Sequence, residues 1–188
     1  MPRLPRAELE PGLYHVYSRG NRRQAIYHDD NDRRRYVKLL ERVTLRMRWR
    51  SLAYCLMGNH LHLLVETRTP NLGIGMQRFH GTYAQYFNSR HEQVGHLFQG
   101  RFRAKPIESD VQLWVAASYI AMNPVEAGLC RDPAAWPWSS HSFVARNAVP
   151  DWLDHPRLVQ SFASLGGDPR ERYLAYIDAA AKVKGQSL

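Results

Sequence analysis

The sequence predicts an α+β protein, and two observations carry that prediction. Short runs with strand composition alternate with longer segments whose apolar residues recur at helical spacing, in the order β-α-β-β-α-β and then a further helix. A Gly-Asn pair separates two of the strand-like runs, which predicts an antiparallel hairpin. This order is that of the ferredoxin-like arrangement, an antiparallel sheet with helices on one face. An added helix carrying a tyrosine and an irregular, partly helical C-terminal tail complete the predicted fold.

The first half of the chain predicts one helix and three strands. Residues 29–48 read as a helix, because Asp and Asn caps stand at its start and apolar residues follow at spacings of three and four. The Gly58-Asn59 pair joins the second and third strands as a two-residue loop, since glycine adopts positive φ without steric cost. The three strands are expected at residues 12–21, 49–57 and 60–66.

The next elements are a helix, a strand and a second helix. Residues 69–91 predict the helix, and residues 96–108 predict a loop followed by the fourth strand. A capping box that begins at Ser109 predicts a helix over 109–123. Pro124 should end this helix and hold the residue before it out of helical geometry.

The remainder of the chain is less regular. A terminal helix is expected over 168–184, and several tryptophans suggest that the tail packs on the rest of the protein: Trp136, Trp138 and Trp152. We therefore divide the chain into a main domain, residues 1–150, and a helical C-terminal extension, residues 151–188, packed on it.

Charge narrows the functional classes. Lys and Arg total 26 against 17 acidic residues, which gives a net charge of +9. Such a surplus favours a polyanion such as nucleic acid, or an anionic membrane surface, over a merely soluble basic surface. No apolar run approaches the length of a membrane span, and the N-terminal segment lacks the apolar core of a secretory signal. With two cysteines, Cys55 and Cys130, a disulfide framework is not expected and the cytoplasm is the predicted compartment.

The run YCLMGNHLHLLVET places two histidines inside an apolar strand. Because side chains alternate along a strand, His60 and His62 share one face with Leu64 and Glu66. The other face, which carries Leu61, Leu63 and Val65, suits a helix-covered core. Two imidazoles in this relation can converge on one divalent ion. In the expected hairpin, Met57 lies opposite His60 and Cys55 lies opposite His62.

Several readings of the histidine pair stay open at this point. The two side chains could be hydrogen-bonded structural residues of a metal-free nucleic-acid-binding sheet. Cys55, His60 and His62 could form a zinc site with an unnamed fourth ligand. A histidine-triad nucleotide hydrolase would also carry alternating histidines, although its third would fall on Leu64.

The helix expected at 109–123 carries an apolar stripe and, on another face, Tyr119 and Asn123. Those two residues lie one turn apart and project from the same side. A phenol can act as a nucleophile, and an amide oxygen can serve as a third metal ligand. The alternative is an amphipathic core tyrosine followed by a helix C-cap. The stripe consists of Leu113, Trp114, Ala117, Ile120 and Ala121.

Two basic segments are candidates for DNA contact. In GRFRAK the basic side chains alternate with Phe102 and Ala104, so one row could follow a phosphate backbone. A second group follows the first strand, where it could read unpaired bases. The candidate DNA-binding residues are Arg101, Arg103 and Lys105 in the first group, and Arg19, Asn21, Arg22 and Arg23 in the second.

Taken together, these motifs resemble the REP-associated tyrosine transposases, a group of the HUH single-strand nucleases. The resemblance rests on YCLMGNHLHLLVET, LFQGRF and SYIAMNPVEAGL, with further likeness in YHVYSRGNRRQAIYHDDND and WPWSS. It spans roughly residues 12–143. H-x-H with an apolar middle residue is the signature of the wider group.

The resemblance implies a catalytic role for residues 1–150 and a divalent metal, Mg²⁺ or Mn²⁺. It implies His60 and His62 as metal ligands, Tyr119 as the nucleophile that forms a covalent 5′-phosphotyrosine, and Asn123 where related transposases carry a glutamine ligand. The implied activity is cleavage and rejoining of single-stranded DNA bearing a REP hairpin, by a nucleoid-associated protein that works as a monomer rather than a dimer. A REP-binding protein without catalysis and a histidine-dependent nucleotide hydrolase are the alternatives.

Overall fold

The computed structural model describes residues 9–185. Two short segments lie outside this range: residues 1–8 of the expected main domain and residues 186–188 of the expected extension. Residues 1–8 include most of the N-terminal segment in which a secretory signal is not expected. Four strands form one antiparallel sheet in the order β2-β3-β1-β4. Their bounds are β1 Gly12–Arg19, β2 Arg50–Leu56, β3 His60–Thr67 and β4 Arg103–Ile107. With its helices, this sheet confirms the α+β ferredoxin-like prediction.

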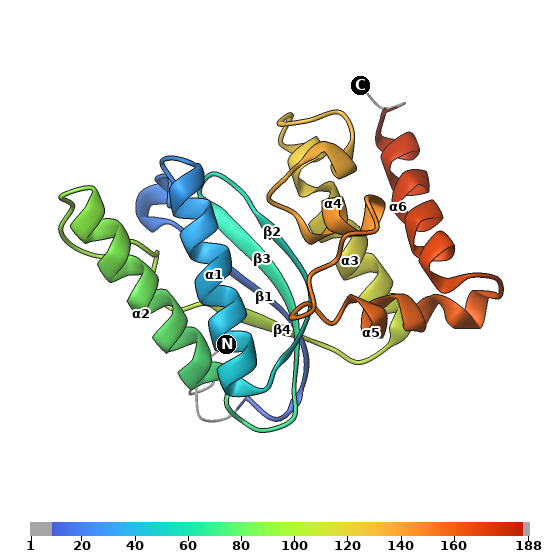
Figure 1. Cartoon of the computed structure of the whole chain (residues 1–188), viewed down its shortest axis with the longest axis horizontal. Coiled ribbons are helices and arrows are strands. Elements are labelled where there is room, and N and C mark those ends of the chain that lie inside the picture. Colours follow the sequence, from blue (N-terminus) through green and yellow to red (C-terminus); the bar gives the residue numbers. More distant parts are fainter. Residues whose placement is uncertain (1–8, 186–188) are drawn as a thin grey trace.

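One face of the sheet is covered by α1 and α2, which lie side by side in Figure 1. Their bounds are α1 Asp30–Met47 and α2 Leu72–Arg90. Asp29 caps α1, because its carboxylate accepts a hydrogen bond from the amide of Asp32. The core between sheet and helices is apolar and aromatic, with Tyr36, Tyr83, Leu61 and Leu63 fully buried.

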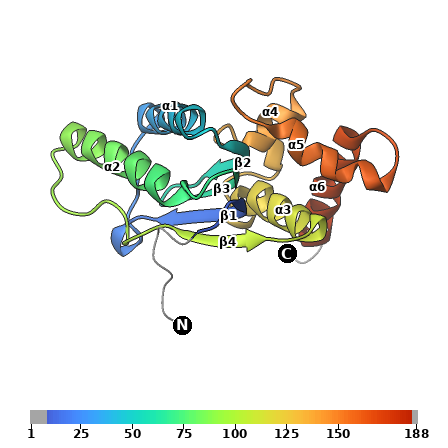
Figure 2. The same cartoon turned by 90° about the horizontal axis from the view of Figure 1, so that it is seen from below.

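The opposite face is covered by the second half of the chain, so the sheet is the middle of three layers (Figure 1). The helices of this layer are α3 Asp110–Glu126, α4 Ser140–Ala145, α5 His155–Gln160 and α6 Pro169–Gly185. Short 3₁₀ turns are η2 Asn21–Arg23, η3 Pro133–Ala135 and η4 Ser161–Leu165. Figure 2 shows α3 beside β1 and β4, with α6 outside it.

The segment between α3 and α5 also follows the open edge of β2. The amide of Leu56 donates to the carbonyl of Trp138, and the amide of Asp154 donates to the carbonyl of Ser51. The Trp136 indole donates to the carbonyl of Leu56 at 3.0 Å. These bonds satisfy backbone groups that an edge strand would otherwise expose. These hydrogen bonds therefore attach the segment between α3 and α5 to the edge strand β2 of the sheet.

Two local predictions are wrong. Pro124 does not end its helix: α3 continues to Glu126, and Asn123 stays inside it. The backbone beyond the proline still bonds back, since the amide of Ala127 reaches the carbonyl of Asn123 at 3.0 Å. In the hairpin, Gly58 does not take positive φ, although the two-residue loop forms as predicted and the amide of Met57 donates to the carbonyl of His60.

Candidate functional site

The site begins with the register of the sheet. Across β1 and β3, Tyr17 lies opposite His62 and Arg19 lies opposite His60; across β1 and β4, His15 lies opposite Lys105. Paired residues share a face of the sheet. Imidazole, phenol and basic side chains from three strands are therefore gathered on the face that α3 flanks.

A cleft of about 850 Å³ lies between this face and α3. One side of it is basic, and the other, made by α3 and the end of β4, carries exposed apolar side chains such as Val111 and Val115. The residues that line it include His15, Tyr17, Arg19, His60, His62, Arg101, Arg103, Lys105, Gln112 and Tyr119.

Tyr119 and the histidine pair meet at this cleft. The ring centroid of Tyr119 lies 5.2 Å from that of His62, and the centroids of His60 and His62 are 5.1 Å apart. His62 is only 5% exposed, whereas Tyr119 is 44% exposed. The phenol therefore lies beside the buried imidazole of His62 and remains accessible to a ligand in the cleft.

Asn123 lies one turn along α3 and is 8% exposed. Its amide nitrogen donates to the backbone carbonyl of Tyr119 at 2.8 Å. Its side chain is also within hydrogen-bonding reach of His60. The structure thus brings Asn123 to the histidine pair, on the same helix as Tyr119.

The imidazoles of the site are held neutral. Burial is the main cause that lowers the pKa of His62 to about 3, with the nearby His15, His60 and Arg19 acting in the same direction. Burial also lowers the pKa of His60, with Arg19 acting in the same direction and the hydrogen bond with Asn123 opposing it. Neutral imidazole is the form that ligates a metal ion.

The donor atoms of the site fit a divalent ion. His62 Nε2 is buried and has no hydrogen-bond partner, which leaves a nitrogen lone pair or N–H unsatisfied in the cleft. Beside it stand the His60 imidazole and the Asn123 amide. Two imidazoles and an amide oxygen suit Mn²⁺ better than Mg²⁺, which prefers oxygen donors.

Within residues 9–185 no group of three or more His, Cys, Asp or Glu side chains is placed to hold a metal ion. The candidate set therefore depends on the amide of Asn123. Cys55 does lie opposite His62 as predicted, but burial raises the pKa of its thiol and its sulfur contacts Met57. A zinc site that includes this cysteine is not favoured.

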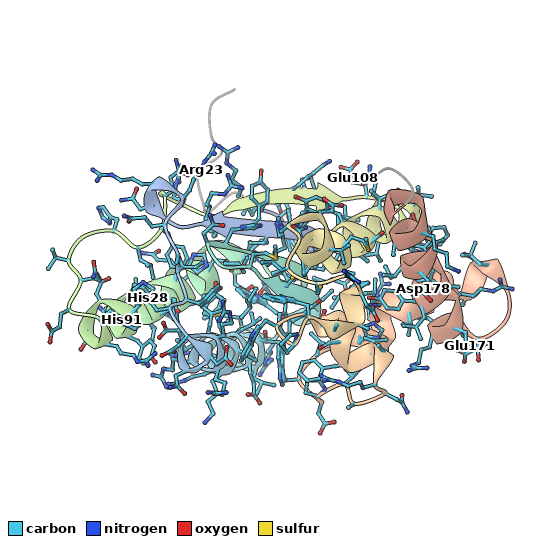
Figure 3. All side chains as sticks on the ribbon, turned by 90° about the horizontal axis from the view of Figure 1, so that it is seen from above. Arg23, His28, His91, Glu108, Glu171 and Asp178 are labelled. Atoms are coloured by element: carbon cyan, nitrogen blue, oxygen red, sulfur yellow. The ribbon has the colours of Figure 1, made fainter. Side chains whose placement is uncertain are left out.

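The candidate DNA-binding residues fall into two places. Arg19 and the predicted row of Arg101, Arg103 and Lys105 line the cleft, and Phe102 and Ala104 pack on the opposite face of the sheet as expected. The remaining three candidates form η2 beyond the end of β1 and do not line the cleft: Asn21, Arg22 and Arg23. Figure 3 shows Arg23 at one end of β4 and Glu108 near the other.

The η2 turn has an unusual backbone. Arg22 and Arg23 have φ of 52° and 61°, in the left-handed region that non-glycine residues seldom adopt. Both side chains are exposed. Strain of this kind persists where surrounding structure imposes it, and it is common at ligand-binding positions.

Two further residues of the site stand on β1, and the first of them, His15, was not predicted from the sequence. His15 Nε2 lies 2.9 Å from His62 Nδ1, and its ring centroid is 5.8 Å from that of Tyr119. The Tyr17 ring lies 6.1 Å from that of His62. The available signal was the alternation of His15 and Tyr17 on β1, which repeats the spacing of the histidine pair. This alternation indicates a shared site only once the register between β1 and β3 is known.

The structure thus has an antiparallel ferredoxin-like sheet that presents a histidine pair to the helix of Tyr119 across a basic cleft. This is the arrangement of a nucleic-acid-processing protein. The family model described as "Transposase IS200 like" matches residues 11–123, and the chain belongs to this family. None of the curated proteins compared with the chain matches it.

Among solved structures, the chain is similar to one described as a REP-associated tyrosine transposase bound to a REP hairpin. The TM-score is 0.62 at 19% sequence identity, over 80% of this chain and 89% of that one. This likeness shows the shared fold. With the family match, it confirms the resemblance that the sequence motifs carry. Across the part of the chain that is described, no helix is long and apolar enough to cross a membrane.

Proposed function

We propose that this transposase-family protein is a metal-dependent endonuclease and strand transferase acting on single-stranded DNA that bears a REP hairpin. The observation that carries the proposal is the meeting of Tyr119 with His60 and His62 in one basic cleft. The solved relative supports the partner, because it is described as bound to a REP hairpin. We assign the chemistry to residues 1–150 and a supporting role to 151–188.

Tyr119 is the proposed nucleophile. Its phenolic oxygen attacks the scissile phosphorus, a P–O bond to tyrosine forms, and the P–O bond to the 3′-oxygen breaks. The phenolic proton passes to solvent, and the leaving 3′-oxygen takes a proton from water. The products are a covalent 5′-phosphotyrosine and a free 3′-hydroxyl. Attack of another 3′-hydroxyl on this linkage rejoins the strand and restores Tyr119.

His60, His62 and Asn123 are the proposed metal ligands. A Mn²⁺ or Mg²⁺ ion bound there would polarise the scissile phosphate and neutralise the charge that builds on its oxygens. The chain's own contribution is to hold two neutral imidazoles and an amide in a largely buried position. The ring of the exposed Tyr119 lies edge-on to that of His62, with the centroids 5.2 Å apart.

The basic side chains of the cleft are the proposed contacts for the phosphates of the DNA. Arg19, Arg103 and Lys105 line the cleft at spacings set by the strands, so they can contact successive phosphates. The strained η2 turn lies beyond the end of β1 with its arginines exposed, and we propose that Asn21, Arg22 and Arg23 read the unpaired bases beside the hairpin. We further propose that the protein acts as a monomer in the cytoplasm, associated with the nucleoid.

The test is adduct formation on a labelled single-stranded REP hairpin with Mn²⁺, followed on a denaturing gel. The wild-type protein should form a covalent protein–DNA band that chelator abolishes. Tyr119→Phe should bind the hairpin with unchanged affinity and form no adduct. His60→Ala combined with His62→Ala should also lose the adduct.

A different result would favour one of the two rivals. Hairpin binding without adduct or cleavage in wild type would leave a REP-binding protein that lacks catalysis. Turnover of free nucleotides with no requirement for a hairpin would point to a nucleotide hydrolase instead.

A further inference from the structure

A metal-ligating histidine uses the lone pair of one ring nitrogen, and the proton must then sit on the other nitrogen. Partners of that second nitrogen fix the tautomer and the ring orientation. The two candidate ligands, His60 and His62, each have such a partner at Nδ1. The atoms that contact Nδ1 therefore decide whether Nε2 of each ring is available in the cleft.

For His60 the partner is Asn59. The Asn59 amide nitrogen donates to the backbone carbonyl of Arg23 at 2.9 Å, and a carbonyl oxygen can only accept. This contact fixes the orientation of the Asn59 amide, so its oxygen faces His60 Nδ1 at 2.7 Å. That oxygen can only accept, so a hydrogen bond to it requires the proton on His60 Nδ1, and this tautomer leaves a lone pair on Nε2.

For His62 the partner is His15. Their nitrogens, His62 Nδ1 and His15 Nε2, lie 2.9 Å apart, and either one could hold the shared proton. If His15 donated, His62 Nε2 would carry the ring proton and could not bind a cation. If His62 donates, Nε2 has a lone pair directed into the site, where it has no protein partner.

The position of His15 follows from the sheet. It stands on β1 opposite Leu64 of β3, two residues along from the Tyr17–His62 pair, so it reaches His62 along a diagonal. The two ring centroids are 5.1 Å apart at an angle of 38°. A histidine at this diagonal can meet Nδ1 of His62 without approaching Nε2.

We infer that His15 and Asn59 are positioning residues that hold His62 and His60 in their Nδ1–H tautomers, so that both Nε2 lone pairs are presented to one divalent ion. This inference deepens the proposed function and rests on its metal site. Neither residue is assigned as a ligand of the ion. Each acts through the imidazole to which it is bonded.

The first measurement is the tautomer itself. Long-range ¹H–¹⁵N NMR correlations of the histidine rings in metal-free protein should show both His60 and His62 protonated at Nδ1. His15→Leu, which offers no acceptor, should shift the tautomer of His62 while leaving that of His60 unchanged. Asn59→Leu should do the reverse. A wild-type His62 protonated at Nε2 would overturn the inference.

The second measurement is Mn²⁺ affinity without DNA, by titration with electron paramagnetic resonance. His15→Leu and Asn59→Leu should each weaken Mn²⁺ binding about 10- to 100-fold. His15→Gln, whose amide oxygen can still accept from His62 Nδ1, should bind within about threefold of wild type. Thermal melts show whether each variant is folded. If His15→Leu is unfolded, the wild-type tautomer and the Asn59→Leu variant still test the inference.

A His62→Ala variant separates this inference from the proposed function. In one outcome, His62→Ala loses Mn²⁺ binding while His15→Leu and Asn59→Leu both bind as tightly as wild type. This result would overturn the positioning roles but support the metal site. Unchanged binding in His62→Ala would overturn both, since the ion would then bind elsewhere.

Discussion

Gly20 is the residue on which the η2 turn depends. A Cβ built there would stand 2.1 Å from the carbonyl oxygen of Gln24 and 2.9 Å from Cγ2 of Ile26. The first contact is with backbone, which cannot rotate away as a side chain would. The amide of Gly20 also donates to the carbonyl of Asn59, so any shift reaches the hairpin that carries the histidines.

Gly20→Ala should therefore lower the free energy of unfolding by about 1–3 kcal/mol. It should also weaken hairpin binding, because the turn that presents Arg22 and Arg23 must move. Gly58→Ala is the matched control: a Cβ at Gly58 meets nothing within 4 Å, and its φ is not positive. Urea unfolding and a hairpin-binding titration measure both effects. Equal stability of the two variants would contradict the predicted clash.

Asp32 is a buried carboxylate that joins two helices. It is 0% exposed and accepts hydrogen bonds from the amide of His28 and from Arg90 and His91 at the end of α2. Figure 3 shows His28 and His91 together at this end of the molecule, with ring centroids 4.4 Å apart. Burial acts to raise the pKa of Asp32, but the hydrogen bonds outweigh it and the pKa lies below its usual value.

Asp32→Asn should lower the free energy of unfolding by about 3 kcal/mol near neutral pH, because Arg90 loses a buried partner. The folded-state pKa of Asp32 lies below that of the unfolded chain, so its charge contributes stability above about pH 4 and loses that contribution as the pH falls. Wild type should lose stability as the pH falls below about 4. Urea unfolding from neutral to acid pH should show a shallower loss for Asp32→Asn.

Asp30 provides the control for Asp32. It lies two residues away in the same helical turn, is 59% exposed, and pairs with Arg33 at 3.3 Å. Since exposed ion pairs contribute little, Asp30→Asn should change stability by less than about 0.5 kcal/mol. Parallel pH profiles for wild type and Asp32→Asn would refute the assigned role of the buried carboxylate.

At the scale of single residues, the sequence predicts a site residue where its position follows from the periodicity of a helix or strand. Alternation in HLHLLVE predicted that His60 and His62 share a face, and the strand pairing confirms it. It could not find His15, because one histidine in a strand has no periodic partner and its contact with His62 depends on the register of a distant strand. Asn59 looked like a turn residue alone, since its bond to the next residue is visible only in three dimensions.

At the scale of elements, β4 decides how the cleft is charged. It is the outer strand next to β1, and Ala104 packs on the core between two residues that line the cleft. Arg103 and Lys105 are exposed on the cleft side. Charges on an edge strand also discourage pairing with another chain, so their effect on DNA has to be measured directly.

Arg103→Gln combined with Lys105→Gln should weaken binding of single-stranded DNA and reduce its salt dependence. Each phosphate contact on a single strand contributes about 0.7 to the slope of log K against log salt, so losing two should reduce the slope by up to about 1.4. The matched control is Arg42→Gln with Arg46→Gln, which removes the same charge from α1 on the opposite face. If both double variants change the slope equally, the row does not contact DNA specifically.

Predictions at the element scale failed at helix ends and turns, for local reasons. Pro124 was expected to stop α3, yet a proline affects mainly the turn that precedes it, and only two helical residues follow. The consequence is functional, because Asn123 stays helical and keeps its side chain at the histidines. In contrast, the cap at Ser109 was predictable, since its hydroxyl accepts from the amide of Gln112 as the motif requires.

At the scale of the whole molecule, the C-terminal extension completes the second core. Four of its side chains are at most 2% exposed and pack against the sheet and α3: Leu158, Phe162, Tyr173 and Ile177. Phe162 stacks on Trp114 of α3, with ring centroids 5.1 Å apart. The helix that carries Tyr119 is thus held between the sheet and the tail. Sequence periodicity could not reveal this position, because periodicity shows which face of a single helix is apolar but not what packs against that face.

Removing residues 151–188 should therefore unfold more than the tail. Burial of a large apolar side chain contributes about 1.5–3 kcal/mol, so losing four costs about 6–12 kcal/mol, comparable with the whole stability of a typical protein of about 5–15 kcal/mol. Leu113 and Ile120 of α3 would also become exposed to water. We expect the 1–150 fragment to show no cooperative thermal transition by circular dichroism, whereas the full protein should melt cooperatively. A 1–150 fragment that unfolds cooperatively at the full-length melting temperature would instead make the extension an independent appendage, and Tyr119 would then be positioned by the sheet alone.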